Sequence, residues 1–342
     1  MPRPSARLLA LLLLIAHECR SEEFAGEPYL LGSSVATNGS SGALPSRMNT
    51  VTQYLDFPGD LGPARLFRLE MATLPAFASL SQAFNGALAY SLDANTQVIF
   101  YTGMVTTPDI TMLPILPGTV EGRINDPRLR PSDCPECTVM KDVVYHANLN
   151  FMRKYSSFVP RTDISNRPIP IEFSVGATSK YYYEELEAGD YEAQNLNLDL
   201  GACVKFLWGY NPVTHLSDRD IKIQLGGFEL LPTKQKSTFS QATVYEAMER
   251  RWHLSASWEE GLPAWGSTLA LGVTQKSESG RWPSLGAEWD LRGLLCLRAG
   301  WDQEFLSAGS SLAYRWFSVH YAFRHHELGT SLYQVSAQVQ WP

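Results

Sequence analysis

Near its C-terminus the chain alternates strictly between two kinds of side chain. The odd positions are apolar: Tyr333, Val335, Ala337, Val339 and Trp341. The even positions carry only amides and hydroxyls: Gln334, Ser336, Gln338 and Gln340. An alternation with period two predicts a β-strand with one apolar and one polar face. Because the polar face contains no Lys or Glu, we expect the apolar face to meet lipid and the polar face a wet lumen.

The same alternation occurs at Val143–Phe151 and again at Phe317–Arg324. Along the chain it marks roughly 12 to 14 strand segments of about ten residues, the length that a tilted strand needs to cross a bilayer. Beyond the first residues, no apolar run is long enough for a membrane-spanning helix, so a membrane reading requires a closed barrel. We therefore predict an all-β fold, a transmembrane antiparallel β-barrel of about 14 strands.

The composition favours this fold. Charged residues make up 18% of the chain, below the roughly 25% of a typical soluble domain. Aromatic residues make up 11%, and membrane barrels use them as girdles at the two interfaces. The net charge of −7 argues against a nucleic-acid partner. A soluble β-sandwich or propeller would alternate too, but the long strands and the uncharged polar face favour the barrel.

The N-terminus predicts export. Arg3 and Arg7 precede the unbroken apolar run Leu8–Ala16, the pattern of a secretory signal peptide. We assign residues 1–21 to this signal, with cleavage after Ser21; a lipoprotein signal with Cys19 as the lipidated residue is the alternative. Residues 22–60 are rich in Gly, Ser, Asn and Pro and predict a plug-like N-terminal segment. Residues 61–342 are then the barrel, exported to the bacterial outer membrane.

One stretch inside the predicted barrel does not read as strand. Residues 106–141 contain six prolines, which remove hydrogen bonds from a sheet, and therefore predict a long loop or a constriction of the lumen. The loop contains Cys134 and Cys137 in the order Cys-Pro-Glu-Cys. A zinc site would need a second pair of ligands nearby, so we expect either a disulfide that staples the loop or two free thiols.

Seven histidines raise the possibility of an outer-membrane hydrolase. Ser318 and His320 share the predicted lumen face of one strand, and His146 faces the lumen by the same parity. Such a pair needs hydrogen-bond contact and a third orienting group, and we interpret these residues as lining of a wet lumen. The acidic stretch from Glu184 to Asp190 could bind a divalent cation but fits a solvated loop better. We predict no catalytic residue, no metal site and no cofactor, and the sequence does not identify the ligand-binding residues.

The second half of the chain, roughly residues 165–342, resembles a known family. Three stretches carry the resemblance: Ile171–Tyr181 followed by Asn197–Gly201, Leu297–Trp301 followed by Ala308 and Gly309, and His320–Phe323 followed by Glu327–Leu332. In order and spacing they are similar to the PorV-type outer-membrane proteins and the FadL-like long-chain fatty-acid transporters. The Gly-Met-Gly-Ala and Asn-Pro-Ala-Gly segments that the family has near its mature N-terminus are absent here.

This resemblance implies a 14-stranded barrel with an N-terminal hatch, and two roles. The first is a FadL-like, porin-like transporter of hydrophobic or small amphipathic molecules. The alternative is a PorV-like protein that docks or shuttles secreted proteins without transport. An outer-membrane hydrolase is the third hypothesis. The expected partners are membrane lipid, the barrel-assembly machinery, which reads the aromatic end at Trp341, and either a hydrophobic small molecule or a secreted cargo protein. Pro342 after Trp341 departs from the usual signal for that machinery.

Overall fold

The computed structural model describes residues 40, 43, 50–60, 67–76, 81–112, 138–162, 168–187, 191–209, 219–231, 234–239, 242–247, 250–262, 265–277, 283–303, 305–326 and 331–341. The predicted signal peptide and the Cys134–Cys137 pair lie outside these residues. In the described part of the chain, no helix has the length and apolar character needed to span a bilayer.

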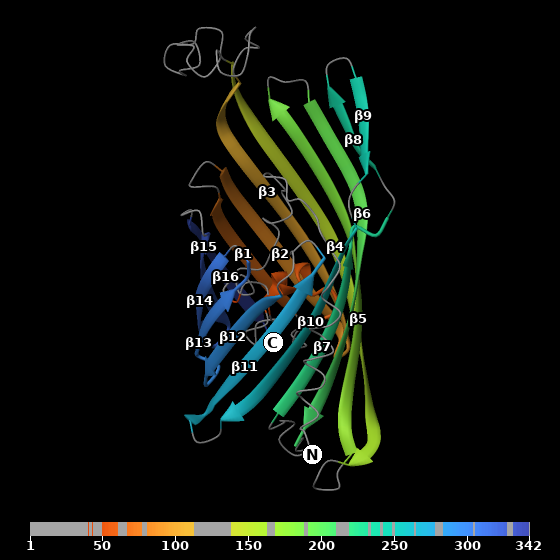
Figure 1. Cartoon of the computed structure of the whole chain (residues 1–342), viewed down its shortest axis with the longest axis vertical. Helices are drawn as coiled ribbons and strands as arrows, with labels where there is room; N and C mark the ends of the chain where they lie inside the picture. Colours follow the sequence, from red (N-terminus) through yellow and green to blue (C-terminus); the bar gives the residue numbers. More distant parts are fainter. Residues whose placement is uncertain are drawn as a thin grey trace.

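The described chain is almost entirely antiparallel strand (Figure 1). The first strands are β1 (Phe67–Ala76), β2 (Ser81–Asp93), β3 (Thr96–Met112), β4 (Thr138–Thr162), β5 (Pro168–Glu187) and β6 (Tyr191–Trp208). They are followed by β7 (Arg219–Phe228), β8 (Lys234–Phe239), β9 (Ala242–Ala247), β10 (Arg251–Leu262) and β11 (Ser267–Lys276). The last are β12 (Ser284–Leu291), β13 (Leu295–Trp301), β14 (Phe305–Tyr314), β15 (Phe317–His326) and β16 (Ser331–Trp341).

These strands close into a ring. Each pairs with its neighbours around the sheet, β16 returns to β1, and the additional β5–β6 pairing completes the circle. The short β8–β9 hairpin pairs with the first residues of β6 and stands outside the ring. The ring itself therefore has 14 strands, as predicted. At the closing seam Phe67 is in register with Trp341, and their rings meet edge to face at 5.2 Å. The last aromatic of the chain therefore helps to close the barrel.

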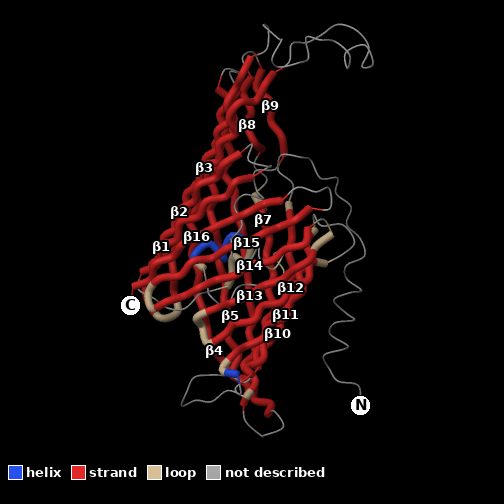
Figure 2. Tube along the Cα trace, turned by 90° about the vertical axis from the view of Figure 1, so that its left-hand side faces the viewer, coloured by secondary structure: helices blue, strands red, loops and turns tan. Residues whose placement is uncertain are grey.

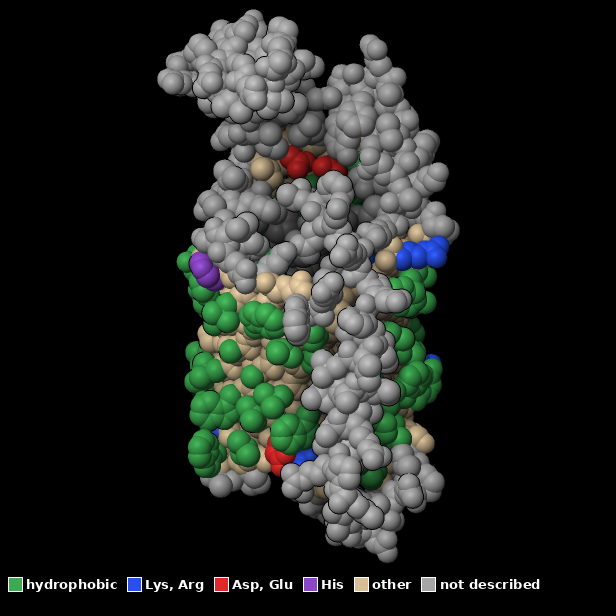
Figure 3. Space-filling model, viewed as in Figure 1, with side chains coloured by type: hydrophobic (Ala, Val, Ile, Leu, Met, Phe, Trp, Pro, Cys, Tyr) green, Lys and Arg blue, Asp and Glu red, His purple; other side chains and the backbone are tan. Residues whose placement is uncertain are grey.

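The two faces of the wall differ as the alternation predicted. On β16 Tyr333 and Val335 are exposed on the outside, whereas Gln334, Ser336 and Gln338 are buried inside. Figure 3 shows hydrophobic side chains in a broad band over the lower part of the face seen there. Apolar surface of this extent needs an apolar surrounding, and the polar interior matches the lumen of a transmembrane barrel.

The barrel is taller on one side. β3 to β6 and the β8–β9 hairpin rise above the level at which β1 and β12 to β16 end (Figures 1 and 2). The pairing of β2 with β3 stops at Gln82 and Thr106, while β3 and β4 stay paired up to Met112 and Thr138. This corrects the predicted loop at residues 106–141, because both of its ends belong to strands. Pro108 is tolerated there because it lies in a register shift of the β3–β4 pair, beyond the last β2 partner.

The tight turns follow local chemistry. Between β12 and β13 the chain turns through Arg292 and Gly293, which both have positive φ, at 58° and 66°. Two such residues form the type of two-residue turn that matches the twist of a hairpin. Gly293 adopts this conformation without a steric penalty.

Inside the ring lies a short segment, Thr50–Asp60, which we call the inner segment. It contains the 3₁₀ helix η2 (Val51–Leu55), whose first four residues are buried. Figure 2 shows this helix among the strands. Val51 and Tyr54 pack against buried residues of β2, β3 and β4, including Ile99 and Met152. The interior of the barrel is thus occupied at this level.

Candidate functional site

The start of the inner segment is held by polar side chains of two neighbouring strands, β1 and β16, where Glu70 is in register with Gln338. The Val51 amide donates to Gln338 Oε1 at 2.9 Å. The amide and the hydroxyl of Thr52 both donate to Glu70 Oε2, at 2.9 and 3.0 Å. Thr52 therefore gives one oxygen of the fully buried Glu70 carboxyl group two hydrogen bonds.

A row of glycines receives the end of this segment. Gly176 on β5 is in register with Gly201 on β6, which is in register with Gly226 on β7. A Cβ atom at Gly176 or Gly201 would overlap the backbone of Pro58 or Gly59, and one at Gly226 would touch Pro58. We call these three glycines the glycine seat. Only glycine lets two backbones come this close.

An ion group ties the same end of the segment to β7. Asp60 accepts from Gln53 Nε2 at 2.5 Å and lies 3.5 Å from the ammonium of Lys222. The same ammonium lies 3.9 Å from Glu259 on β10. The Lys222 ammonium therefore lies between two carboxylates, one from the inner segment and one from the wall. All three side chains are nearly buried.

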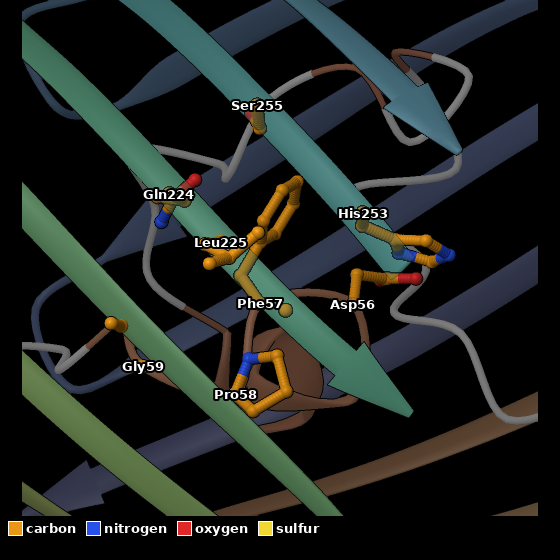
Figure 4. Close-up of a pocket in the computed structure, with 10 residues that line it drawn as sticks. Asp56, Phe57, Pro58, Gly59, Gln224, Leu225, His253 and Ser255 are labelled. Atoms are coloured by element: carbon orange, nitrogen blue, oxygen red, sulfur yellow. The ribbon is translucent and has the colours of Figure 1, made fainter. Parts of the chain in front are cut away.

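A small cavity of about 10 Å³, which is room for about one water molecule, lies between the inner segment and the wall. Its lining comes from Asp56, Phe57, Pro58 and Gly59 of the segment and from residues of β6, β7 and β10, among them Gln224, His253 and Ser255. In Figure 4 the Asp56 carboxylate and the His253 ring point toward one another, and the Phe57 ring lies beside Gln224 and Ser255. The cavity therefore combines an aromatic ring with hydrogen-bonding groups.

A second group of charges marks the point where β7 ends. Glu229 has a positive φ of 55°, and its amide donates to Asp199 Oδ1 at 3.1 Å. The ammonium of Lys180 lies 2.6 Å from Glu229 and 2.9 Å from Asp199, and Arg251 lies 3.8 Å from Glu229. These side chains neutralise one another on the inner wall and bend the chain out of the strand.

The predicted Ser318 and His320 pair does make contact. Ser318 Oγ lies 3.0 Å from His320 Nε2, and Ser311 Oγ lies 2.7 Å from His320 Nδ1. Arg298 Nη1 donates to Ser311 Oγ at 2.7 Å, which leaves the Ser311 hydroxyl able to donate to the imidazole. His320 is fully buried, and the described hydrogen bonds of its ring go to Ser311 and Ser318. These hydrogen bonds join the neighbouring strands β13, β14 and β15.

The other predicted residues lie apart from this pair. His146 faces inward on β4, in register with Tyr182 on β5, with ring centroids 6.1 Å apart. Glu184 accepts from the Tyr182 hydroxyl at 2.7 Å, and the acidic stretch ends outside the described residues at Asp190. Among the described residues, no group of three or more His, Cys, Asp or Glu side chains could hold a metal ion.

Sequence reasoning missed the glycine seat and the cavity beside it. A usable signal was present, because each seat glycine lies alone or paired inside a strand pattern, and such a glycine indicates close approach of another backbone. The register that lines up Gly176, Gly201 and Gly226 is a property of the folded sheet.

No family model matches the chain, and no curated protein matches it. Solved structures that are similar include the CymD monoaromatic hydrocarbon channel, with a TM-score of 0.42, 10% identity and coverage of 91% of this chain and 98% of that one. A Pseudomonas aeruginosa FadL homologue has a TM-score of 0.32, 8% identity and coverage of 91% and 98%.

CdiB from Escherichia coli has a TM-score of 0.40 and 7% identity; the match covers 81% of this chain but only 64% of CdiB. All three likenesses concern outer-membrane barrels, and at these scores they do not identify a family. The barrel assignment rests on the strand pairing of this chain.

Proposed function

We propose that this chain is a bacterial outer-membrane channel for small hydrophobic or amphipathic molecules, and that the inner segment is its closure. The observation that supports the proposal is the glycine seat. The wall has no side chain at Gly176 and Gly201, and Pro58 and Gly59 lie against it there. This close fit gives the inner segment one defined closed position. Beside the packing of Val51 and Tyr54, the segment is held by hydrogen bonds and ion pairs, which water can replace when the segment moves.

Single-channel recording in planar bilayers tests this function. In a Gly176→Ala, Gly201→Ala double variant each methyl group overlaps the segment's backbone, and overpacking of this kind costs about 1–3 kcal/mol. We expect the segment to leave its seat more often, so that open events become at least tenfold more frequent. Gly86→Ala is the matched control, because a Cβ at Gly86 meets nothing within 4 Å.

Heat-dependent migration on a gel shows whether each variant is folded. A folded double variant with the open probability of the unchanged protein would contradict the proposal. Uptake of a small amphipathic solute into liposomes should rise in the same variant.

The second candidate function is docking of a secreted protein, with the barrel as an anchor. The observation that favours it is the tall sheet of β3 to β6, which β8 and β9 extend; in the described part of the chain β9 pairs with β8 alone (Figure 1). A sheet edge can pair with an incoming strand. Replacing Lys234–Ala247 with a flexible linker should abolish co-purification of a cargo protein and leave conductance unchanged. We propose no enzymatic role, and full lipid stability in the presence of the purified barrel is the expected result.

A further inference from the structure

His253 continues the row of the glycine seat across the inner wall. It lies on β10 in register with Gly226, the third glycine of the seat, and its ring packs against the Phe228 ring at a centroid distance of 4.3 Å. The histidine is half-buried, so water still reaches it. The wall thus has a histidine directly beside the place where Pro58 lies against it.

Asp56 faces this histidine from the inner segment. The Asp56 carboxylate and the His253 ring point toward one another (Figure 4), and both residues line the same small cavity. The Asp56 amide donates to the Gln53 carbonyl at 3.2 Å, which fixes Asp56 at the end of η2. Because Asp56 is two residues from Pro58, a contact that holds Asp56 also holds the seated end of the segment.

The neighbouring elements also bring charges close to His253. They are Arg251 on the same strand, Lys276 in register on β11, Glu229 just after β7 and, beyond the Phe228 ring, Lys180. Glu229 lies 2.6 Å from the Lys180 ammonium and 3.8 Å from Arg251, so the wall itself balances its charge. Lys276 opposes a positive charge on the histidine, and Asp56 favours one.

We propose that Asp56 and His253 form a pH-dependent latch that keeps the inner segment closed. A histidine gains a positive charge as the pH falls through the range from about 8 to 5. The charged ring attracts the Asp56 carboxylate, whereas the neutral ring does not. The closed position is therefore favoured at low pH and becomes weaker as the pH rises. The latch adds regulation to the proposed closure, so it rests on the proposed function.

Single-channel recording at about pH 5.5 and about pH 7.5, on either side of the ordinary titration of a histidine, tests the latch. An ion pair that water can reach shifts an equilibrium by up to about fivefold. We therefore expect the open probability of the parent protein to rise about three- to fivefold between the two pH values. Salt at about 1 M screens exposed charges and should reduce this rise.

Two substitutions at His253 separate its charge from its shape. His253→Gln is neutral at both pH values, so its open probability should equal that of the parent protein at the higher pH throughout. His253→Lys is charged at both pH values, so its open probability should stay at the low-pH value of the parent. Asp56→Asn keeps the backbone contact with Gln53 and should also remove the pH dependence.

His146→Gln is the matched control. His146 is another half-buried histidine of the inner wall, but it lies against Tyr182 and does not line the cavity. This variant should keep the pH dependence of the parent protein. Heat-dependent migration on a gel shows that each variant is folded.

Three results would overturn the latch: an open probability that is equal at both pH values in the parent protein, a pH dependence that persists in His253→Gln, or a pH dependence that His146→Gln abolishes. If the parent protein shows no pH dependence but the double glycine variant opens, the channel stands and the latch falls.

A readout without conductance separates the latch from the channel function. The protection of the inner-segment amides from hydrogen exchange, corrected for the intrinsic pH dependence of exchange, should fall between the same two pH values in the parent protein and stay constant in His253→Gln. If it does so while the double glycine variant stays closed, the latch stands and the channel falls. Constant protection in the parent protein would overturn the latch.

Discussion

The most severe single substitution that the wall offers is Arg298→Met. Arg298 Nε donates to Glu288 Oε2 at 2.7 Å, and both side chains are completely buried on the inner wall. The substitution removes the cation that Arg298 supplies to Glu288 and leaves the carboxylate buried without it. Breaking a buried pair in this way costs about 3–5 kcal/mol. The loss of the hydrogen bond to Ser311 adds about 1 kcal/mol.

A double-mutant cycle separates the pair from its surroundings. Replacing both partners by apolar residues, Glu288→Leu with Arg298→Met, removes the unpaired charge and should recover most of the stability. We expect the single variant to lose about 4 kcal/mol and the double variant less than 2 kcal/mol, a coupling of roughly 2 kcal/mol or more. The assay is reversible urea unfolding in lipid vesicles, followed by tryptophan fluorescence.

Two results would refute this reasoning. Equal losses in the single and the double variant would show that the charge is solvated in the folded barrel. A single variant with unchanged stability would show that another group replaces Arg298 as the partner of Glu288. The first outcome would also mean that water reaches the inner wall near Glu288 and Arg298.

Three further substitutions test other parts of the barrel. Trp341→Ala removes the ring contact at the closing seam and should cost about 1–2 kcal/mol in the same unfolding assay; no loss would mean that the strand pairing alone closes the ring. Burial, and then the nearby Glu184, raise the pKa of Asp142, which lies beyond the last β2–β3 pair, to about 6. Because the folded pKa is raised, the destabilisation by the charged Asp142 is absent below about pH 4 and complete above about pH 6, roughly 1 kcal/mol after screening. The protection of β4 amides from hydrogen exchange, corrected for the intrinsic pH dependence of exchange, should fall over this range in the parent protein and stay constant in Asp142→Asn. Lys222→Met leaves Asp60 facing a second carboxylate, so a thiol probe on the inner segment should react several-fold faster than in the parent protein, and an unchanged rate would contradict the role given to this lysine.

The faces of the C-terminal strands could be predicted from the sequence, because an alternation with period two places successive side chains on opposite sides of a strand. A strand between lipid and a wet lumen must be apolar on one side, so parity alone placed His320 inside, where it is fully buried. Its contact with Ser311 could not be predicted, because Ser311 lies on the neighbouring strand and only the register brings the two together.

The same reason explains what was missed at the candidate site. Gly176, Gly201 and Gly226 are ordinary strand glycines until the register lines them up against Pro58. The prediction that the chain leaves the sheet at Pro108 was wrong for a different reason. A proline rule that holds for central strands was applied to a position that has no β2 partner, and the strand continues through it.

The contacts of the inner segment set how often the barrel can open. Described hydrogen bonds join it and Ala43 to Gln338, Glu70, Ser174 and Thr274, and an ion pair joins it to Lys222. At about 1 kcal/mol each, these polar contacts favour the closed position by roughly 5 kcal/mol. The burial of Val51 and Tyr54 adds to this preference. Unaided release would then be limited to fewer than about one molecule in several thousand. A channel with this closure needs something that binds the released state better than the closed one, because a ligand with equal affinity for both shifts nothing.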